Sequence, residues 1–87
     1  MELPGQELVE SGLRDLENGV ESLEALLVAI GAPRLRRLGI HVPGTPTEPE
    51  QRLYELLASD DPDSAHSRYN ALVRRLVSYE RAAECAS

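Results

Sequence analysis

The 87-residue sequence contains no lysine, phenylalanine or tryptophan, and its only cysteine is Cys85. A single cysteine cannot form a bridge within the chain, which excludes the small disulfide-stabilised class of secreted domain. The longest apolar run, from Ala25 to Ile30, is far shorter than the ~20 residues that a membrane-spanning helix needs. Glu2 and Glu7 stand where a secretory signal would be basic. We therefore expect a cytoplasmic protein without membrane association.

Positive charge is scarce: 15 Asp and Glu residues outnumber nine Arg residues, for a formal net charge of −6. This excess of negative charge repels phosphate backbones, so nucleic acid is not the expected partner. Aromatic residues make up only 3% of the chain, and the abundance of Leu, Ala, Arg and Glu favours helix over sheet. A domain of this size buries only about 60–65% of the surface of its unfolded chain. It must therefore pack efficiently, dimerise or dock on a partner.

The spacing of apolar residues and helix breakers predicts an all-α fold, a small bundle of about four helices. We expect a single domain over residues 1–87, with an N-terminal hairpin over 5–39, a Pro-rich connector over 41–49 and a C-terminal hairpin over 50–84. The first helix follows Pro4-Gly5 and ends at Asn18-Gly19. Its apolar face comprises Leu8, Val9, Leu13 and Leu16.

Ser22 is expected to cap the second helix, whose inner face comprises Leu23, Leu26, Leu27 and Ile30. We expect Gly31 to end this helix and Pro33 to begin a separate short element that Gly39 closes.

Beyond the connector, Thr47 and Glu50 have the spacing of a capping box. The helix that follows is expected to place three leucines on one face: Leu53, Leu56 and Leu57. An aspartate-rich turn ends it, in which Asp60 or Asp61 serves as the N-cap of the last helix.

The last predicted helix has the most regular pattern in the chain. Its apolar residues recur at alternating steps of four and three, a seven-residue repeat: Ala65, Tyr69, Leu72, Leu76, Tyr79 and Ala83. About twenty residues make a rod of roughly 30 Å, and part of its stripe must belong to the core of the domain. A chain this small is not expected to cover the whole stripe, so we predict a homodimer interface formed by Tyr69, Leu72, Val73, Leu76 and Tyr79. Glu80 and Glu84 are placed with Arg74 and Arg75 on the solvated face of this helix.

Negative charge is concentrated in the first 31 residues, which hold seven carboxylates and one arginine. Five of these residues are predicted to form an acidic face: Glu7, Glu10, Glu17, Glu21 and Glu24. Such a face accelerates association with a basic partner. Size, acidity and surplus helix surface together favour a non-catalytic protein–protein interaction module that docks on a larger partner and restrains or recruits it. Antitoxins, immunity proteins and adaptor domains are of this kind, and a basic effector or toxin is a fitting partner.

Two other functions stay open at the level of the sequence. Arg36 and His41 are separated by four residues, which is similar to the Arg-x4-6-His motif of the helical HEPN ribonucleases. That resemblance implies cleavage of RNA by these two residues. The second alternative is a regulatory nucleic-acid binder, because the last helix carries four arginines: Arg68, Arg74, Arg75 and Arg81.

Carboxylates and an imidazole also gather around the last turn, at Asp60, Asp61, Asp63 and His66. Their spacing does not match a calcium loop, and a zinc site needs more nitrogen or sulfur ligands. We therefore expect neither a metal nor another cofactor. Cys85 is too close to the chain end to be held in a rigid catalytic arrangement, so no catalytic residue is assigned.

Overall fold

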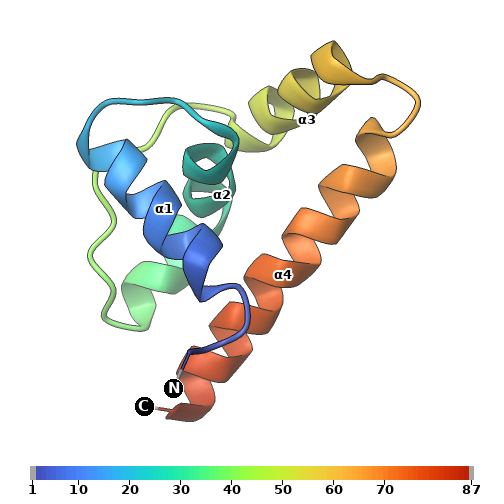
Figure 1. Cartoon of the computed structure of the whole chain (residues 1–87). Helices are drawn as coiled ribbons and strands as arrows, with labels where there is room; N and C mark the ends of the chain where they lie inside the picture. The colour runs from blue at the N-terminus through green and yellow to red at the C-terminus, as the bar shows by residue number, and fades with distance from the viewer. Residues whose placement is uncertain (1, 87) are drawn as a thin grey trace.

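A computed structural model describes residues 2–86, and over this range the chain forms four helices and no strand (Figure 1). The helices are α1 (Gln6–Glu17), α2 (Leu23–Arg37), α3 (Pro49–Asp60) and α4 (Ala65–Ala86). α1 contacts α2, and α3 contacts α4. The prediction of an all-α fold with a long C-terminal helix is confirmed.

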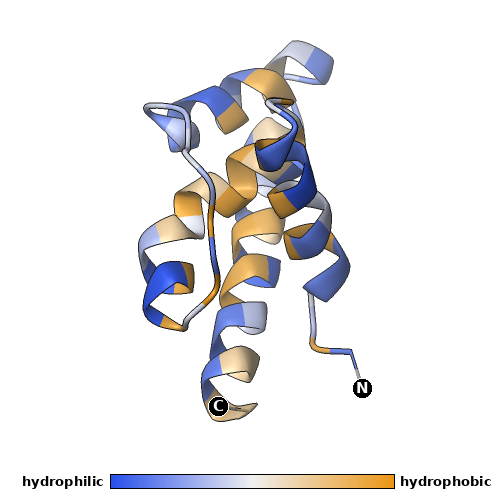
Figure 2. Cartoon of the chain, turned by 90° about the vertical axis from the view of Figure 1, so that its left-hand side faces the viewer, coloured by the Kyte–Doolittle hydropathy of each residue, from blue (hydrophilic) through white to orange (hydrophobic). Residues whose placement is uncertain are grey.

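α2 is the most buried helix, and it contacts α1, α3 and α4. Its buried residues lie on most of its circumference and include five in succession, from Ala25 to Ala29. A helix that is apolar on nearly every side is stable in water only when other helices cover it. Figure 2 shows the apolar positions gathered toward the middle of the molecule, where the largest fully buried side chains are Leu27, Leu35, Leu53, Leu57, Val9 and Val28.

The first hairpin is fixed by local signals that the sequence displays. The Ser22 hydroxyl accepts the N–H of Ala25 at the start of α2, as predicted. α1 ends with Gly19 at a φ of 71°, and the N–H groups of Gly19 and Val20 bond to the carbonyls of Leu16 and Asp15. This pair of bonds is the Schellman motif, which favours glycine in the left-handed position.

The predicted break at Gly31 and Pro33 is wrong, because α2 continues through both residues to Arg37. Gly31 instead allows α4 to approach closely: a Cβ atom at Gly31 would lie 2.9 Å from Glu80 Oε2 and 3.0 Å from the Leu76 methyl groups. Pro33 removes one N–H from the hydrogen-bond ladder. The helix nevertheless continues because Leu35, beyond the proline, is fully buried in the common core.

The start of α3 also differs from the prediction. The N-cap is Glu48, whose φ is 51° and whose side chain makes no capping bond, and Pro49 occupies the first turn. Thr47 therefore does not form a capping box with Glu50. The predicted leucine face is wrong at one position: Leu53 and Leu57 are buried, whereas Leu56 is 42% exposed. The buried side of α3 runs through Leu53 and Leu57, and Leu56 lies beside it.

The turn between α3 and α4 is held by Asp61. Its Oδ1 accepts the N–H of Asp63, and its Oδ2 accepts the hydroxyl of Ser64. α4 then begins at Ala65 and runs for 22 residues. The prediction that Glu80 lies on a solvated face is wrong, since Glu80 is 4% exposed and faces α2 at Gly31.

Candidate protein-binding surfaces

The predicted interface stripe of α4 faces the other helices of the same chain. Leu76 is 3% exposed, and four further members are partly buried against the core: Tyr69, Leu72, Val73 and Tyr79. The Tyr69 ring packs on Tyr54 of α3, with 5.9 Å between centroids and 58° between ring planes. Within the described chain, the stripe is therefore used first for internal packing.

The two tyrosines of this stripe lie in different surroundings. Burial raises the pKa of Tyr69, and Glu50 of α3 raises it further. Burial also raises the pKa of Tyr79, with an added contribution from Glu10 of α1. Desolvation of a phenol disfavours its charged form, so both tyrosines keep their proton to a higher pH than an exposed tyrosine does.

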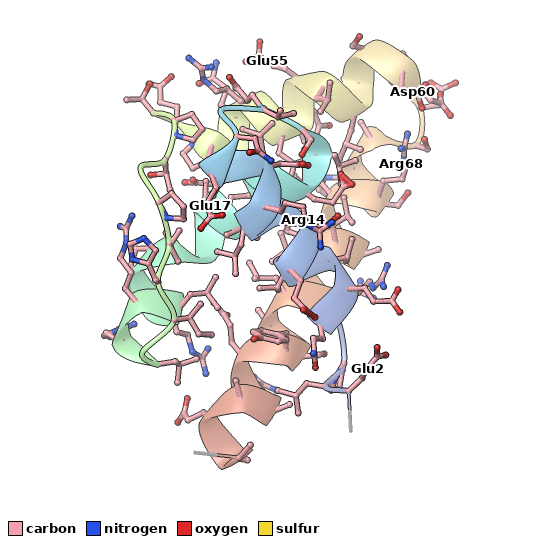
Figure 3. The ribbon with its side chains drawn as sticks, turned by 60° about the vertical axis from the view of Figure 1, so that its left-hand side comes forward. Glu2, Arg14, Glu17, Glu55, Asp60 and Arg68 are labelled. Carbon is pink, nitrogen blue, oxygen red and sulfur yellow. The ribbon has the colours of Figure 1, made fainter. Side chains whose placement is uncertain are left out.

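The predicted acidic face is spread over three segments. Glu7, Glu10 and Glu17 are exposed on α1, and Figure 3 labels Glu17 on this helix. Glu21 is exposed in the turn before α2, and Glu24 is half-buried in the first turn of α2. Glu10 accepts a hydrogen bond from Gln6. The three α1 carboxylates thus remain on the surface, whereas Glu21 lies beside residues of the connector and of α3.

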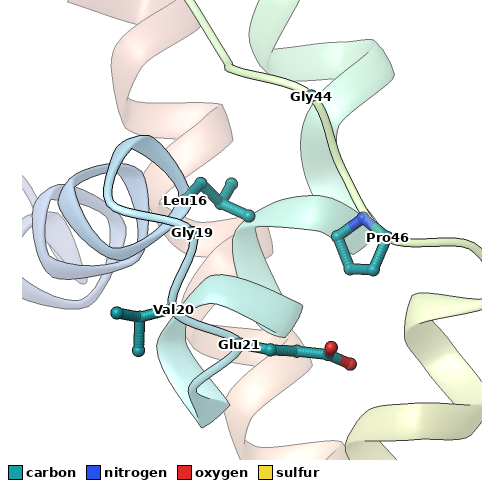
Figure 4. Close-up of a pocket in the computed structure, with 6 residues that line it drawn as sticks. All are labelled: Leu16, Gly19, Val20, Glu21, Gly44 and Pro46. Carbon is teal, nitrogen blue, oxygen red and sulfur yellow. The ribbon is translucent and has the colours of Figure 1, made fainter.

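Glu21 joins two hollows in the surface. The first, of about 170 Å³, lies between the α1–α2 turn and the connector (Figure 4). Leu16 and Pro46 face one another across it, and its other lining residues are Gly19, Val20, Glu21 and Gly44. The second, of about 520 Å³, lies between α2 and α3 and is lined by Glu21, Leu26, Glu48, Arg52, Glu55 and Leu56. We call the two together the acidic hollow.

The charge balance of the acidic hollow is negative. Arg52 Nη1 lies 2.7 Å from Glu21 Oε1, and this bond raises the pKa of Arg52, with further contributions from Glu48 and Glu55. One guanidinium thus faces three carboxylates. Such a site attracts a cationic group more strongly than an anionic one.

The acidic hollow also contains exposed apolar side chains. Val20 is 49% exposed and Leu56 is 42% exposed; each lines one of the two parts. Sequence reasoning missed Glu48, Glu55 and Leu56 as site residues. The charged side chains at 48, 52 and 55 have the i, i+4, i+7 spacing of a single helix face, which was the available signal.

The arginines of the alternative functions have structural contacts in two cases. Arg36 Nη2 donates to the carbonyl oxygens of Val42 and Pro43, at 3.2 Å each, and so ties the end of α2 to the connector that carries the exposed His41. Arg68 forms an ion pair of 2.8 Å with Asp60. The other three arginines of α4 are exposed: Arg74, Arg75 and Arg81.

Among residues 2–86, no three His, Cys, Asp or Glu side chains are grouped so that they could hold a metal ion. His66 Nε2 instead lies 3.2 Å from the Asn70 side-chain amide, one turn along α4. No helix in the same part of the chain has the length and apolar character required to cross a membrane.

Comparison with known proteins adds no assignment. No protein-family model matches the chain, and no curated protein or solved structure matches it. Function must therefore be argued from the surfaces themselves.

Proposed function

We propose that this protein is a non-catalytic binding module that docks on a larger protein partner through the acidic hollow. The partner would present a segment with apolar side chains flanked by Arg or Lys, as a basic effector or toxin could. One observation carries the proposal: Val20 and Leu56, two large apolar side chains left exposed by the fold, lie in hollows lined by Glu21, Glu48 and Glu55.

The apolar part of the hollow would contribute affinity. Complete burial of a leucine side chain contributes about 1.5–3 kcal/mol. Leu56 is 42% exposed, so covering the rest of it would contribute on the order of 1 kcal/mol. Val20 lines the adjoining hollow and would add a similar amount where a partner spans both hollows.

The carboxylates would contribute rate and selectivity. Exposed charges change association rates and discriminate between partners more than they change affinity. Glu7, Glu10 and Glu17 on the neighbouring helix α1 would extend the negative field beyond the hollow. Docking would restrain or recruit the partner, in the manner of an antitoxin, an immunity protein or an adaptor.

A pair of synthetic peptides tests the proposal. The Arg–Leu peptide is a 15-residue amphipathic helix of Leu, Ala and Arg, and the Glu–Leu peptide replaces each Arg with Glu. Binding of each labelled peptide to the full chain is measured by fluorescence anisotropy. We expect saturable binding of the Arg–Leu peptide, which weakens as salt is raised because the charges are exposed.

Two variants and a matched control locate the binding. Leu56→Ser should raise the Kd for the Arg–Leu peptide about fivefold, which corresponds to the order of 1 kcal/mol above. Glu55→Gln should raise it about two- to fourfold. Glu50→Gln, an exposed glutamate of the same helix outside the hollow, should leave the Kd unchanged. Equal affinities of wild type, Leu56→Ser and Glu55→Gln would overturn the proposal.

A further inference from the structure

A groove of about 240 Å³ lies between the C-terminal half of α2 and α4, away from the acidic hollow. Its apolar lining comes from both helices: Ile30 and Pro33 on α2, and Val73, Leu76 and Val77 on α4. Gly31 also lines it, and its missing side chain lets the two helices approach closely at Leu76. The groove is thus an open notch with apolar walls.

One charged side chain of the groove, that of Arg34, is held by two carboxylates of α4. Glu80 is 4% exposed, and its Oε1 lies 3.7 Å from Arg34 Nη1, while Arg34 Nη2 lies 3.0 Å from Glu84 Oε2. Arg34 is therefore held between two glutamates of α4. Its position at the edge of the groove is set before any partner arrives.

The remaining charges around the groove are positive and exposed. Arg37 lines it directly. Arg81 lies four residues after Val77 and therefore on the same side of α4. Among residues 2–86, neither Arg37 nor Arg81 forms an ion pair. The groove thus combines apolar walls with a basic rim, the opposite of the acidic hollow.

We propose that this groove binds an acidic amphipathic helix of a protein partner. Apolar side chains of that helix would cover Ile30, Val73 and Val77, and its carboxylates would pair with Arg37 and Arg81. A helix laid into a groove between two helices is a recurrent mode of recognition. Charge complementarity selects an acidic helix for this groove.

Other occupants fit the groove less well. Its volume is below the ~300–1,000 Å³ of small-molecule sites. It is lined by no aromatic ring on which a base could stack. An acidic amphipathic helix offers apolar side chains to the walls of the groove and carboxylates to the arginines of its rim. The inference is independent of the acidic hollow, which selects the opposite charge.

The Glu–Leu peptide tests this inference on the full chain by fluorescence anisotropy. We expect the double variant Arg37→Gln/Arg81→Gln to raise its Kd about tenfold. Val77→Ser should raise it about three- to fivefold through loss of apolar contact. Arg75→Gln is the matched control: Arg75 is also exposed on α4 but lies beside the N-terminal segment, near Gly5 and Glu7. It should leave the Kd unchanged.

Three results would overturn the inference: no saturable binding of the Glu–Leu peptide, equal affinity of wild type and the double arginine variant, or displacement of the peptide by an equal concentration of single-stranded RNA. Circular dichroism of each variant shows that a change in Kd comes from a folded protein. Failure here leaves the acidic hollow untouched, because that site is read with the Arg–Leu peptide and the variants of Leu56 and Glu55.

Discussion

Substitution of Gly12 by alanine should destabilise the protein although alanine is the better helix former. Gly12 lies in α1 and is buried against α2. A Cβ atom built there would lie 2.3 Å from the carbonyl oxygen of Glu24 and 2.4 Å from Val28 Cγ2. Ordinary contacts of a Cβ atom are 3.4–4 Å. The Glu24 contact is with backbone, so a rotamer change cannot relieve it, and α1 must move away from α2.

The magnitude follows from two opposing effects. Within a helix, alanine is favoured over glycine by up to about 1 kcal/mol. Forcing extra volume into a well-packed contact costs about 1–3 kcal/mol and occasionally more. The overlap at Gly12 is severe and involves backbone, which puts the cost at the upper end of that range. We therefore expect the Gly12→Ala variant to lose about 2 kcal/mol of unfolding free energy.

Urea denaturation followed by circular dichroism measures this loss, with the slope m checked for constancy. Gly44→Ala is the matched control, since a Cβ atom there meets nothing within 4 Å and Gly44 does not have a positive φ. That variant should be neutral or slightly more stable, because alanine restricts the unfolded chain. If Gly12→Ala proves as stable as Gly44→Ala, the close contact of α1 with α2 is refuted.

Three further results are expected. Ser22→Ala should lower the unfolding free energy by about 1 kcal/mol, since Ser22 caps α2 and also donates to Asp15; an unchanged urea midpoint would contradict the cap. Burial raises the pKa of Glu80 above its ordinary 4.5, while Arg34 and Arg37 lower it in part. The folded state then binds the Glu80 proton more tightly than the unfolded state, so this contribution to stability is complete below about pH 4.5 and is lost as pH rises through the raised value. The stability of Glu80→Gln relative to wild type should therefore increase from pH 4 to pH 7, and a constant difference would show that Glu80 is not desolvated. Sedimentation equilibrium tests the homodimer expected from the α4 stripe: with Leu76 already buried, a dimer would depend on the partly buried Leu72 and Tyr79, and Leu72→Ser should shift it toward monomer, whereas a wild-type monomer at every concentration would contradict that dimer.

The sequence was sufficient to predict features that depend on a few neighbouring residues. Ser22 at the start of α2 and Gly19 at the end of α1 act within a few residues, so their roles follow from chain order alone. The four helices and the length of α4 follow from apolar spacing in the same way. These features can be predicted without knowing which helices pack against each other.

The sequence was insufficient where two distant segments decide the outcome. Gly31 resembles a helix terminator, yet it serves the approach of α4 at Leu76. Glu80 has the sequence surroundings of a solvated residue, yet it is buried opposite that glycine. Leu56 follows the helical spacing of its neighbours but falls outside the narrow side of α3 that reaches the core. Each case depends on the angle at which helices meet, which residue spacing does not encode.

The candidate surfaces also combine features that the sequence predicts with features that depend on the fold. An excess of carboxylates in the N-terminal segment is plain from composition. The meeting of Glu21 with Arg52, 31 residues further along the chain, requires the fold. α2 takes part in both surfaces, with Leu26 in the acidic hollow and Ile30 in the basic-rimmed groove. One helix therefore connects the two surfaces for which we propose partners of opposite charge.

The most direct test of the acidic hollow is a titration of the isotope-labelled full chain with the Arg–Leu peptide, followed by NMR. We expect saturable shifts of the amide signals of Val20, Glu21 and Leu56, with much smaller shifts along the exposed side of α4. Shifts confined to α4, or none at these three residues, would contradict the proposed function.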